Sequence, residues 1–238
     1  MGRRAKRNDN NIVEFLPNND RYKKEVILIP RNLNQEHYIY ELLNPSSTIT
    51  FGVGPAGTGK TMLAVLAAIK YLKQNQINKI IITRPAVGVD DEKHGFLPGD
   101  LNAKMEPWTR PIFDVFEEYF NTKAIQQLLA ENIIEISPLA FMRGRTFKDA
   151  YIIADEMQNA TPNQMKMLLT RIGENSRMVV TGDVKQTDKR DIENGLLDFE
   201  KLFNIYNNSE FVKFVRFSHK DIERHPAVTE VLEIYGDA

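Results

Sequence analysis

Residues 54–61 read GPAGTGKT and fit the spacing G-x-x-x-x-G-K-[ST]. The stretch before it, 49–53, is an apolar run, and residues 60–73 are apolar almost all round. We expect a buried strand, a glycine-rich turn and a helix packed inside the protein, in that order. Because both flanks fit, the pattern predicts a P-loop domain rather than an isolated glycine-rich turn.

The glycine-rich stretch has the chemistry of a phosphate site. Glycines let the backbone turn several N–H groups inward at the positive end of a helix. The Lys60 ammonium would reach the β- and γ-phosphates, and the Thr61 hydroxyl would ligate Mg²⁺. We therefore predict that ATP and Mg²⁺ bind here, at Gly54, Pro55, Ala56, Gly57, Thr58, Gly59, Lys60 and Thr61.

The rest of the chain alternates between two kinds of segment. Strands are predicted at 79–83, 133–136, 151–154, 178–181 and 211–217, and helices at 35–43, 107–130, 162–172, 195–206 and 221–234. Thr161 and Gln164 predict a capping box at the start of one helix. Several strands are continuous Ile and Val runs, which are typical of parallel strands buried on both faces. The pattern predicts an α/β fold with a doubly wound, mostly parallel sheet.

Length and composition fit one large domain. The chain has 238 residues, a formal net charge of −1 and no cysteine, which excludes a disulfide scaffold and a thiolate metal site. A polyanion would need a local basic patch. The basic start predicts a disordered tail over 1–20 and one domain over 21–238. No apolar run approaches the ~20 residues that span a bilayer, so we expect a soluble, cytoplasmic protein without a membrane partner.

Two adjacent carboxylates form a second candidate site. Asp155 and Glu156 follow the apolar run 151–154. Asp155 would hold Mg²⁺, directly or through water, and Glu156 would act as the general base for the attacking water. Such a pair alone is a common acidic turn at a strand end. Downstream of a P-loop it predicts nucleotide hydrolysis.

Two short motifs resemble those of superfamily 1 helicases. Residues 155–158, DEMQ, resemble motif II, and residues 181–186, TGDVKQ, resemble motif III. The resemblance implies that Gln186 senses the γ-phosphate and couples hydrolysis to strand contacts; the alternative is a polar turn residue. It also implies that Gln35 reads the adenine edge, since an amide offers a donor and an acceptor. The alternative for Gln35 is an exposed glutamine at a helix start.

Longer segments resemble the PhoH family, a group of phosphate-starvation-inducible, helicase-like ATPases. The resemblance covers roughly residues 30–235. Its segments read ITRPAV (82–87), GFLPGDL (95–101), SPLAFMRGRTF (137–147), TPNQMKMLLTR (161–171) and DIERHP (221–226). The resemblance implies a single RecA-like core lobe, ATP with Mg²⁺, a ring-like homo-oligomer and a role in RNA metabolism.

Basic side chains near these motifs are candidates for contacts with nucleic acid or with a neighbouring subunit's nucleotide. Guanidinium groups grip phosphates well, although each could equally be a surface charge. The candidates are Arg84, Arg143, Arg145 and Lys185. Aromatic side chains near them would stack on bases or pack in the core, and these are Phe96, Trp108 and Phe141.

The chain beyond motif III is short. After Gln186, 52 residues remain, too few for the second RecA-like lobe of a monomeric helicase. That lobe supplies an arginine worth about 10³–10⁵ in rate. We therefore expect a head-to-tail ring, for example a hexamer, in which each subunit completes its neighbour's site. The arginine candidates are Arg143, Arg145 and Arg224.

Three functions fit these observations. The preferred one is an ATPase of helicase type that is coupled to single-stranded RNA or DNA. The second is a nucleotide-controlled, ring-forming switch or scaffold without translocation. The third is a small-molecule P-loop kinase, which would share 54–61 but has no use for the two helicase-like motifs. The preferred function assigns catalytic roles to Lys60, Asp155, Glu156, Gln186 and Arg224.

Overall fold

Six apolar segments pair into one sheet in the computed structural model, which describes residues 23–85, 101–186, 194–223 and 226–235. The strand order is β3-β2-β4-β5-β1-β6, and neighbouring strands run parallel. The strands are β1 (Ile49–Val53), β2 (Lys79–Thr83), β3 (Ile134–Ile136), β4 (Ala150–Ala154), β5 (Arg177–Gly182) and β6 (Val212–Arg216). The predicted parallel α/β sheet is confirmed.

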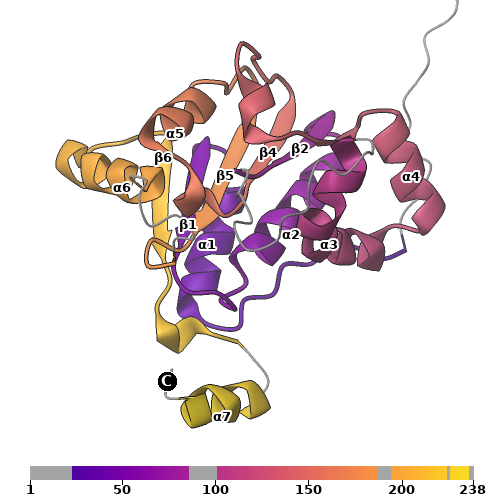
Figure 1. Cartoon of the computed structure of the whole chain (residues 1–238). Helices are drawn as coiled ribbons and strands as arrows, with labels where there is room; N and C mark the ends of the chain where they lie inside the picture. Colours follow the sequence, from indigo (N-terminus) through magenta and orange to yellow (C-terminus); the bar gives the residue numbers. More distant parts are fainter. Residues whose placement is uncertain (1–22, 86–100, 187–193, 224–225, 236–238) are drawn as a thin grey trace, which may run out of the picture.

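Helices cover both faces of this sheet (Figure 1). They are α1 (Leu33–Leu43), α2 (Lys60–Lys73), α3 (Leu101–Tyr119), α4 (Thr122–Ala130), α5 (Pro162–Leu169), α6 (Gly195–Tyr206) and α7 (Pro226–Tyr235). One apolar core joins α1 to α4 with Ile80 and Ile82, and the other joins α5 and α6 with Ile81. Because successive strand residues point to opposite faces, both faces need apolar residues. This explains the continuous Ile run of β2 and confirms the doubly wound arrangement.

Strand order brings distant segments of the chain together. β1 leads into the glycine-rich loop, and β4 leads into the acidic pair, with β5 lying between these two strands. Val53 pairs with Gly182 in register, so β1 and β5 end at the same edge of the sheet. The described residues thus form a RecA-like core with one sheet, as predicted. Ligands of such sheets bind beyond the carboxyl ends of the strands.

Several predicted helices have different bounds in the structure. The segment predicted as one helix over 107–130 is divided, because the Asn121 side chain accepts from the N–H of Ala124 and begins α4 anew. The predicted helix over 162–172 ends at Leu169, since Ile172 instead forms an isolated parallel bridge with Phe147. The predicted capping box at the start of α5 is confirmed.

The C-terminal part contains two short elements after β6. The predicted helix over 221–234 is observed as α7, which begins later, at Pro226. The preceding residues form a short 3-10 helix, His219–Asp221, which is capped reciprocally by Ser218 and Asp221. Two further 3-10 helices are η2 (Leu139–Met142) and η3 (Met157–Asn159). Within the described ranges, no helix combines the length and apolarity needed to cross a membrane.

Candidate nucleotide site

The loop between β1 and α2 has a backbone that only glycine adopts readily. Gly54 has φ +144°, and a Cβ there would lie 2.3 Å from the carbonyl oxygen of Phe217. Gly59 has φ +81° and is the N-cap residue of α2. These are conformations that side-chain-bearing residues rarely adopt. The loop therefore wraps tightly over the end of the sheet and presents the N-terminus of α2, which favours an anion.

Lys60 is folded back onto this loop. Its Nζ donates to the carbonyl oxygens of Gly54 at 2.7 Å and Pro55 at 2.6 Å, and to the hydroxyl of Thr58 at 3.2 Å. Burial lowers the pKa of Lys60 below its ordinary value, and carboxylates nearby, Asp183 first among them, oppose this lowering. The ammonium is thus buried among carbonyl and hydroxyl oxygens, and a polyphosphate would be a stronger, charge-assisted partner for it.

Asp155 is held by hydroxyls from two other elements. Its Oδ1 accepts from Oγ1 of Thr61 at 2.8 Å and from Oγ1 of Thr181 at 2.5 Å. Its backbone N–H donates to the carbonyl of Thr83 at 2.9 Å. Thr181 is fully buried at the end of β5. We did not expect a role for Thr181 from the sequence, although its place at a strand end before Gly182-Asp183 was a usable signal.

Glu156 has a left-handed backbone, with φ 54° and ψ 39°. A residue other than glycine rarely adopts this conformation, and such residues cluster at functional sites. The carboxylate is fixed by a hydrogen bond of 2.5 Å from Nε2 of Gln158 to Oε2. Gln158 is buried and was part of the motif read from the sequence, but we did not predict it as a site residue.

These groups surround one cavity of about 280 Å³ beyond the carboxyl ends of the strands. The space is lined by Ala56, Gly57, Gly59, Lys60, Thr61, Met62, Asp155, Glu156, Gly182, Asp183 and Gln186. The predicted P-loop, the acidic pair and Gln186 therefore meet in one place, although more than 120 residues separate the first from the last. Gln186 is exposed, and its N–H donates to the carbonyl of Asp183 at 3.1 Å.

The oxygen atoms of this cavity suit Mg²⁺. Mg²⁺ is commonly held by one or two carboxylates together with phosphate oxygens and water. Thr61 and Asp155 offer a hydroxyl and a carboxylate 2.8 Å apart. This donor pair fits a metal shared with a phosphate ligand, with Thr61 and Asp155 as the protein's contribution.

Gln35 is buried and links two elements, and its proposed contact with the adenine edge stays a prediction. It is 1% exposed, so the interpretation as an exposed helix-start residue is wrong. Its Oε1 accepts from the N–H of Arg31 at 2.9 Å, and its Nε2 donates to the carbonyl of Thr58 at 3.1 Å. Both ends of the amide therefore contact the chain itself, and the side chain ties α1 to the P-loop.

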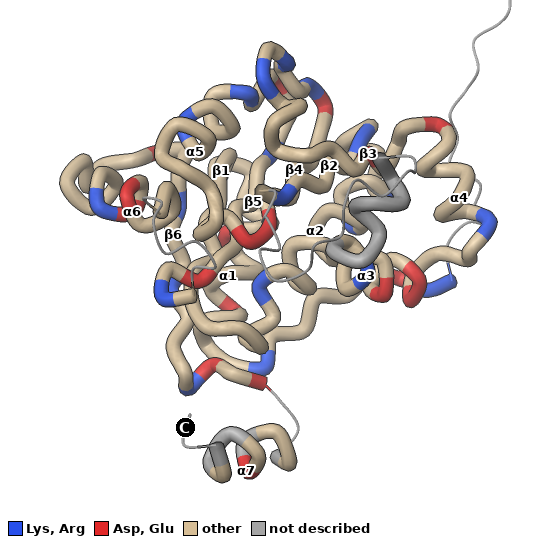
Figure 2. Tube along the Cα trace, viewed as in Figure 1, with Lys and Arg blue, Asp and Glu red and all other residues tan. Residues whose placement is uncertain are grey.

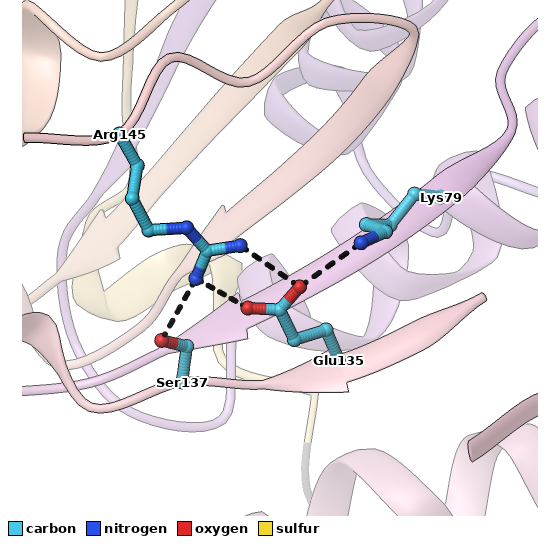
Figure 3. A network of polar contacts seen from close by, with 4 residues as sticks. All are labelled: Lys79, Glu135, Ser137 and Arg145. Atoms are coloured by element: carbon cyan, nitrogen blue, oxygen red, sulfur yellow. Dashed lines mark hydrogen bonds and ion pairs between the residues drawn. The ribbon is translucent and has the colours of Figure 1, made fainter. Parts of the chain in front are cut away.

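Arg145 is engaged within its own chain. Its guanidinium forms a two-pronged ion pair with Glu135 at 2.5 and 3.0 Å, and Lys79 reaches the same carboxylate at 3.1 Å (Figure 3). The guanidinium also lies 4.7 Å from the ring centroid of Phe147. The hydrogen bond from Arg145 lowers the pKa of Glu135, burial opposes this, and Lys79 adds to the lowering. Glu135 stands ten residues away in sequence, and the pairing depends on where β3 ends.

The other basic candidates are spread over the surface. Arg143 and Lys185 are exposed, and Arg84 is half-buried after β2. Figure 2 shows Lys and Arg positions distributed over several elements, with Asp and Glu positions among them. Of the three aromatic candidates, Phe141 is 57% exposed. Two predicted positions, Phe96 and Arg224, and the side chain of Trp108 lie outside the described residues.

The segment after β6 touches the P-loop. The N–H of Glu223 donates to the carbonyl of Gly57 at 3.0 Å. The Asp221 carboxylate accepts from the Asn34 amide at 2.9 Å and from the N–H of Ser218 at 2.7 Å. Residues 221–223 of the late motif are thereby anchored to α1 and to the P-loop at once.

The sequence comparisons agree with this geometry. A family model described as PhoH-like protein matches residues 27–236. A PhoH-like protein of Bacillus subtilis (strain 168) is 43% identical over 206 residues, which are 86% of this chain and 63% of that protein. Protein PhoH of Escherichia coli (strain K12) is 39% identical over 212 residues, 88% of this chain and 58% of that protein. The chain thus spans about three fifths of the length of these curated relatives.

Solved structures give more distant matches. The crystal structure of Pif1 helicase from Candida albicans is 16% identical, with a TM-score of 0.42, over 88% of this chain and 44% of that one. The Sulfolobus solfataricus SWI2/SNF2 ATPase core in complex with dsDNA is 14% identical, with a TM-score of 0.43, over 82% and 46%. The assignment rests on the family model, which matches most of the chain and includes every residue of the described cavity. The chain belongs to the PhoH family.

Proposed function

We propose that this PhoH-family chain binds ATP with Mg²⁺ and hydrolyses it, and that hydrolysis is coupled to binding of single-stranded RNA or DNA. The observation that carries the proposal is the joint contact of Thr61 and Thr181 with one oxygen of Asp155. Thr61 and Asp155 line a cavity that Lys60 and Glu156 also line. A cation, a metal-binding pair and a second carboxylate around one space are the parts that phosphoryl transfer to water needs.

Each side chain has a separate task in the proposed reaction. Lys60 exchanges its carbonyl partners for the β- and γ-phosphates. Thr61 and Asp155 hold Mg²⁺, which neutralises charge on the phosphate oxygens when bound. Glu156 orients the attacking water and accepts its proton. Gln186, on the turn after β5, contacts the γ-phosphate and changes position when it is released.

The nucleic-acid part of the proposal rests on local charge. The chain carries a net charge of −1, so contacts with phosphates must come from particular side chains. Arg143, after η2, and Lys185, next to Gln186, are both exposed. Lys185 adjoins the proposed γ-phosphate sensor, which supports coupling between strand binding and hydrolysis.

The test is ATP hydrolysis with Mg²⁺, alone and with panels of single-stranded RNA, single-stranded DNA and duplexes. We expect a slow basal rate that single strands increase, and an increase that weakens as salt rises, because phosphate contacts release counterions. Absence of hydrolysis under all conditions contradicts the proposal. Hydrolysis that no nucleic acid changes leaves the ATPase in place and refutes the coupling.

We further propose that subunits assemble head to tail into a homo-oligomeric ring, such as a hexamer, and that Arg143 or Arg224 reaches the neighbour's nucleotide. The domain division, with a tail over 1–20 and the ATPase domain over 21–238, stays a prediction. Molar mass in solution with and without ATP tests the ring. A monomer under both conditions refutes it.

A nucleotide-controlled switch is the second candidate function. The contact between Glu223 and the carbonyl of Gly57 favours it, because a change in the P-loop would pass directly to the segment that leads into α7. The switch predicts that molar mass depends on the nucleotide, that hydrolysis ignores RNA and that strand displacement is absent. Faster ATP hydrolysis in the presence of single-stranded RNA or DNA would support the first function instead.

A further inference from the structure

One buried amide joins the candidate base to the neighbouring strand. Gln158 is 3% exposed and lies in η3, directly after the acidic pair. Its Nε2 donates to Oε2 of Glu156 at 2.5 Å, and its Oε1 accepts from the N–H of Asp183 at 3.2 Å. A backbone N–H can only donate and a carboxylate can only accept, so the two partners fix the orientation of the amide.

The packing around Gln158 leaves its side chain little freedom. A Cβ at Gly182 would lie 2.6 Å from Oε1 of Gln158 and 2.7 Å from Cδ2 of Leu196. Residue 182, at the end of β5, must therefore be glycine to leave room for the Gln158 amide. Glu156, which accepts from the Gln158 amide, has a left-handed backbone, a conformation that persists only where surrounding contacts hold it.

The turn that Gln158 contacts is the one that carries Gln186. The Asp183 carboxylate accepts from the N–H of Lys185 at 3.0 Å, and its carbonyl accepts from the N–H of Gln186 at 3.1 Å. A displacement of this turn therefore reaches Glu156 through a single side chain.

We propose that Gln158 is a positioning residue: it holds the Glu156 carboxylate in the cavity and couples it to the turn over 182–186. The inference rests on the proposed ATP hydrolysis. Gln158 acts through Glu156 and takes no part in the chemistry. Its loss should slow hydrolysis and leave ATP binding intact, because small misplacements of a reacting group can reduce rate by about 100-fold.

The experiment uses the full chain with Gln158→Met, which keeps the length of the side chain and removes both hydrogen bonds. Single-turnover hydrolysis, the affinity for a fluorescent ATP analogue and the Tm are measured for each variant. Gln164→Met is the matched control, since Gln164 also bonds a backbone N–H, that of Thr161, in the capping box of α5. We expect Gln158→Met to reduce the hydrolysis rate by roughly 10- to 100-fold, with analogue affinity unchanged and with Gln164→Met hydrolysing like wild type.

A second background separates positioning from a structural effect. Glu156→Gln keeps an acceptor for the Gln158 amide but removes the base. Adding Gln158→Met to it should lower the Tm as much as in the wild-type background, with no further loss of rate. Equal rate losses in both backgrounds, or a single variant that hydrolyses like wild type, would overturn the inference.

The inference can also be tested if Gln158→Met does not fold, and its failure can be told apart from failure of the proposed function. If Gln158→Met does not fold, Gly182→Ala replaces it, because the added methyl group presses on the Gln158 amide, and the same loss of rate is expected. A Gly182→Ala variant that hydrolyses at the wild-type rate would then overturn the inference. If wild type itself does not hydrolyse ATP, the proposed function fails and the inference falls with it; if wild type hydrolyses and the variants do too, the inference alone fails.

Discussion

The hydroxyl of Thr181 donates to Oδ1 of Asp155 at 2.5 Å, from the strand that lies between the P-loop strand and the carboxylate strand. Thr61 donates to the same oxygen at 2.8 Å. The proposed metal ligand is therefore oriented by hydroxyls on both sides of it, one from α2 and one from β5. This arrangement needs β5 between β1 and β4, so the strand order itself builds the site.

Replacing Thr181 by Val tests this orientation. The shapes are similar and the position is fully buried, so the main change is loss of the hydroxyl. Loss of a residue that orients a metal ligand typically reduces metal affinity or activity by about 10- to 100-fold. We expect a higher Mg²⁺ concentration for half-maximal hydrolysis. Thr50→Val, at a buried threonine on β1, should leave the Mg²⁺ dependence unchanged, and an unchanged dependence in Thr181→Val would refute the assignment.

Replacing Lys60 by Ala should remove tight ATP binding. The variant loses a charge-assisted contact with the phosphates, and such contacts are worth about 1.5–3 kcal/mol each, or roughly 10- to 100-fold in affinity. Equilibrium titration with a fluorescent ATP analogue measures the change. Lys70→Ala, at the other end of the same helix, is the matched control and should bind like wild type. Micromolar affinity retained in Lys60→Ala would remove the loop from the proposed site.

Replacing Glu156 by Gln should separate binding from turnover. The amide keeps the shape but cannot accept the proton of water, and general bases contribute about 10²- to 10⁴-fold to rate. We expect ATP to bind with its normal affinity and to stay unhydrolysed on the protein, as measured by filter binding and single-turnover analysis. Turnover at the wild-type rate would show that another group is the base.

Local patterns in the sequence were sufficient for much of the fold. β1, α2, β2 and α6 have the predicted bounds, because each is a continuous apolar or amphipathic run with clear ends. The sequence also predicted that the P-loop and the acidic pair lie close together, because the carboxyl ends of parallel strands meet at one edge of the sheet. Tertiary pairing could not be read in this way. The bond between Gln158 and Asp183 and the pair of Arg145 with Glu135 depend on which strands are neighbours, and the break at Asn121 depends on one capping side chain.

Arg143 and Arg145 should behave differently despite their proximity in sequence. Arg145 is paired with Glu135, and Arg143 is exposed. We expect Arg143→Ala to reduce stimulation by single-stranded RNA, or assembly-dependent hydrolysis, with no change in unfolding free energy beyond about 0.5 kcal/mol. Arg145→Ala should instead destabilise the fold by about 1–2 kcal/mol, through loss of a hydrogen-bonded charge pair. Urea unfolding and stimulated hydrolysis, measured on both variants, make the comparison; the reverse pattern would exchange the two roles.

The pair of Glu135 and Arg145 should also give stability a dependence on pH. The pKa of Glu135 lies below its ordinary value of 4.5 in the folded chain, chiefly because Arg145 donates to the carboxylate. The unfolded state therefore binds the proton first as pH falls, so the contribution is complete well above pH 4.5 and is lost as pH falls through the folded-state pKa. We expect Glu135→Gln to be less stable than wild type at pH 7, and the difference between them to shrink below about pH 4.5. Urea unfolding at several pH values measures this difference.

Glu174→Gln, at an exposed ion pair with Lys148, is the control and should show a much smaller difference throughout. A difference that stays constant from pH 7 into the acid range would mean that the Glu135 carboxylate stabilises the fold through its shape and packing rather than through its charge.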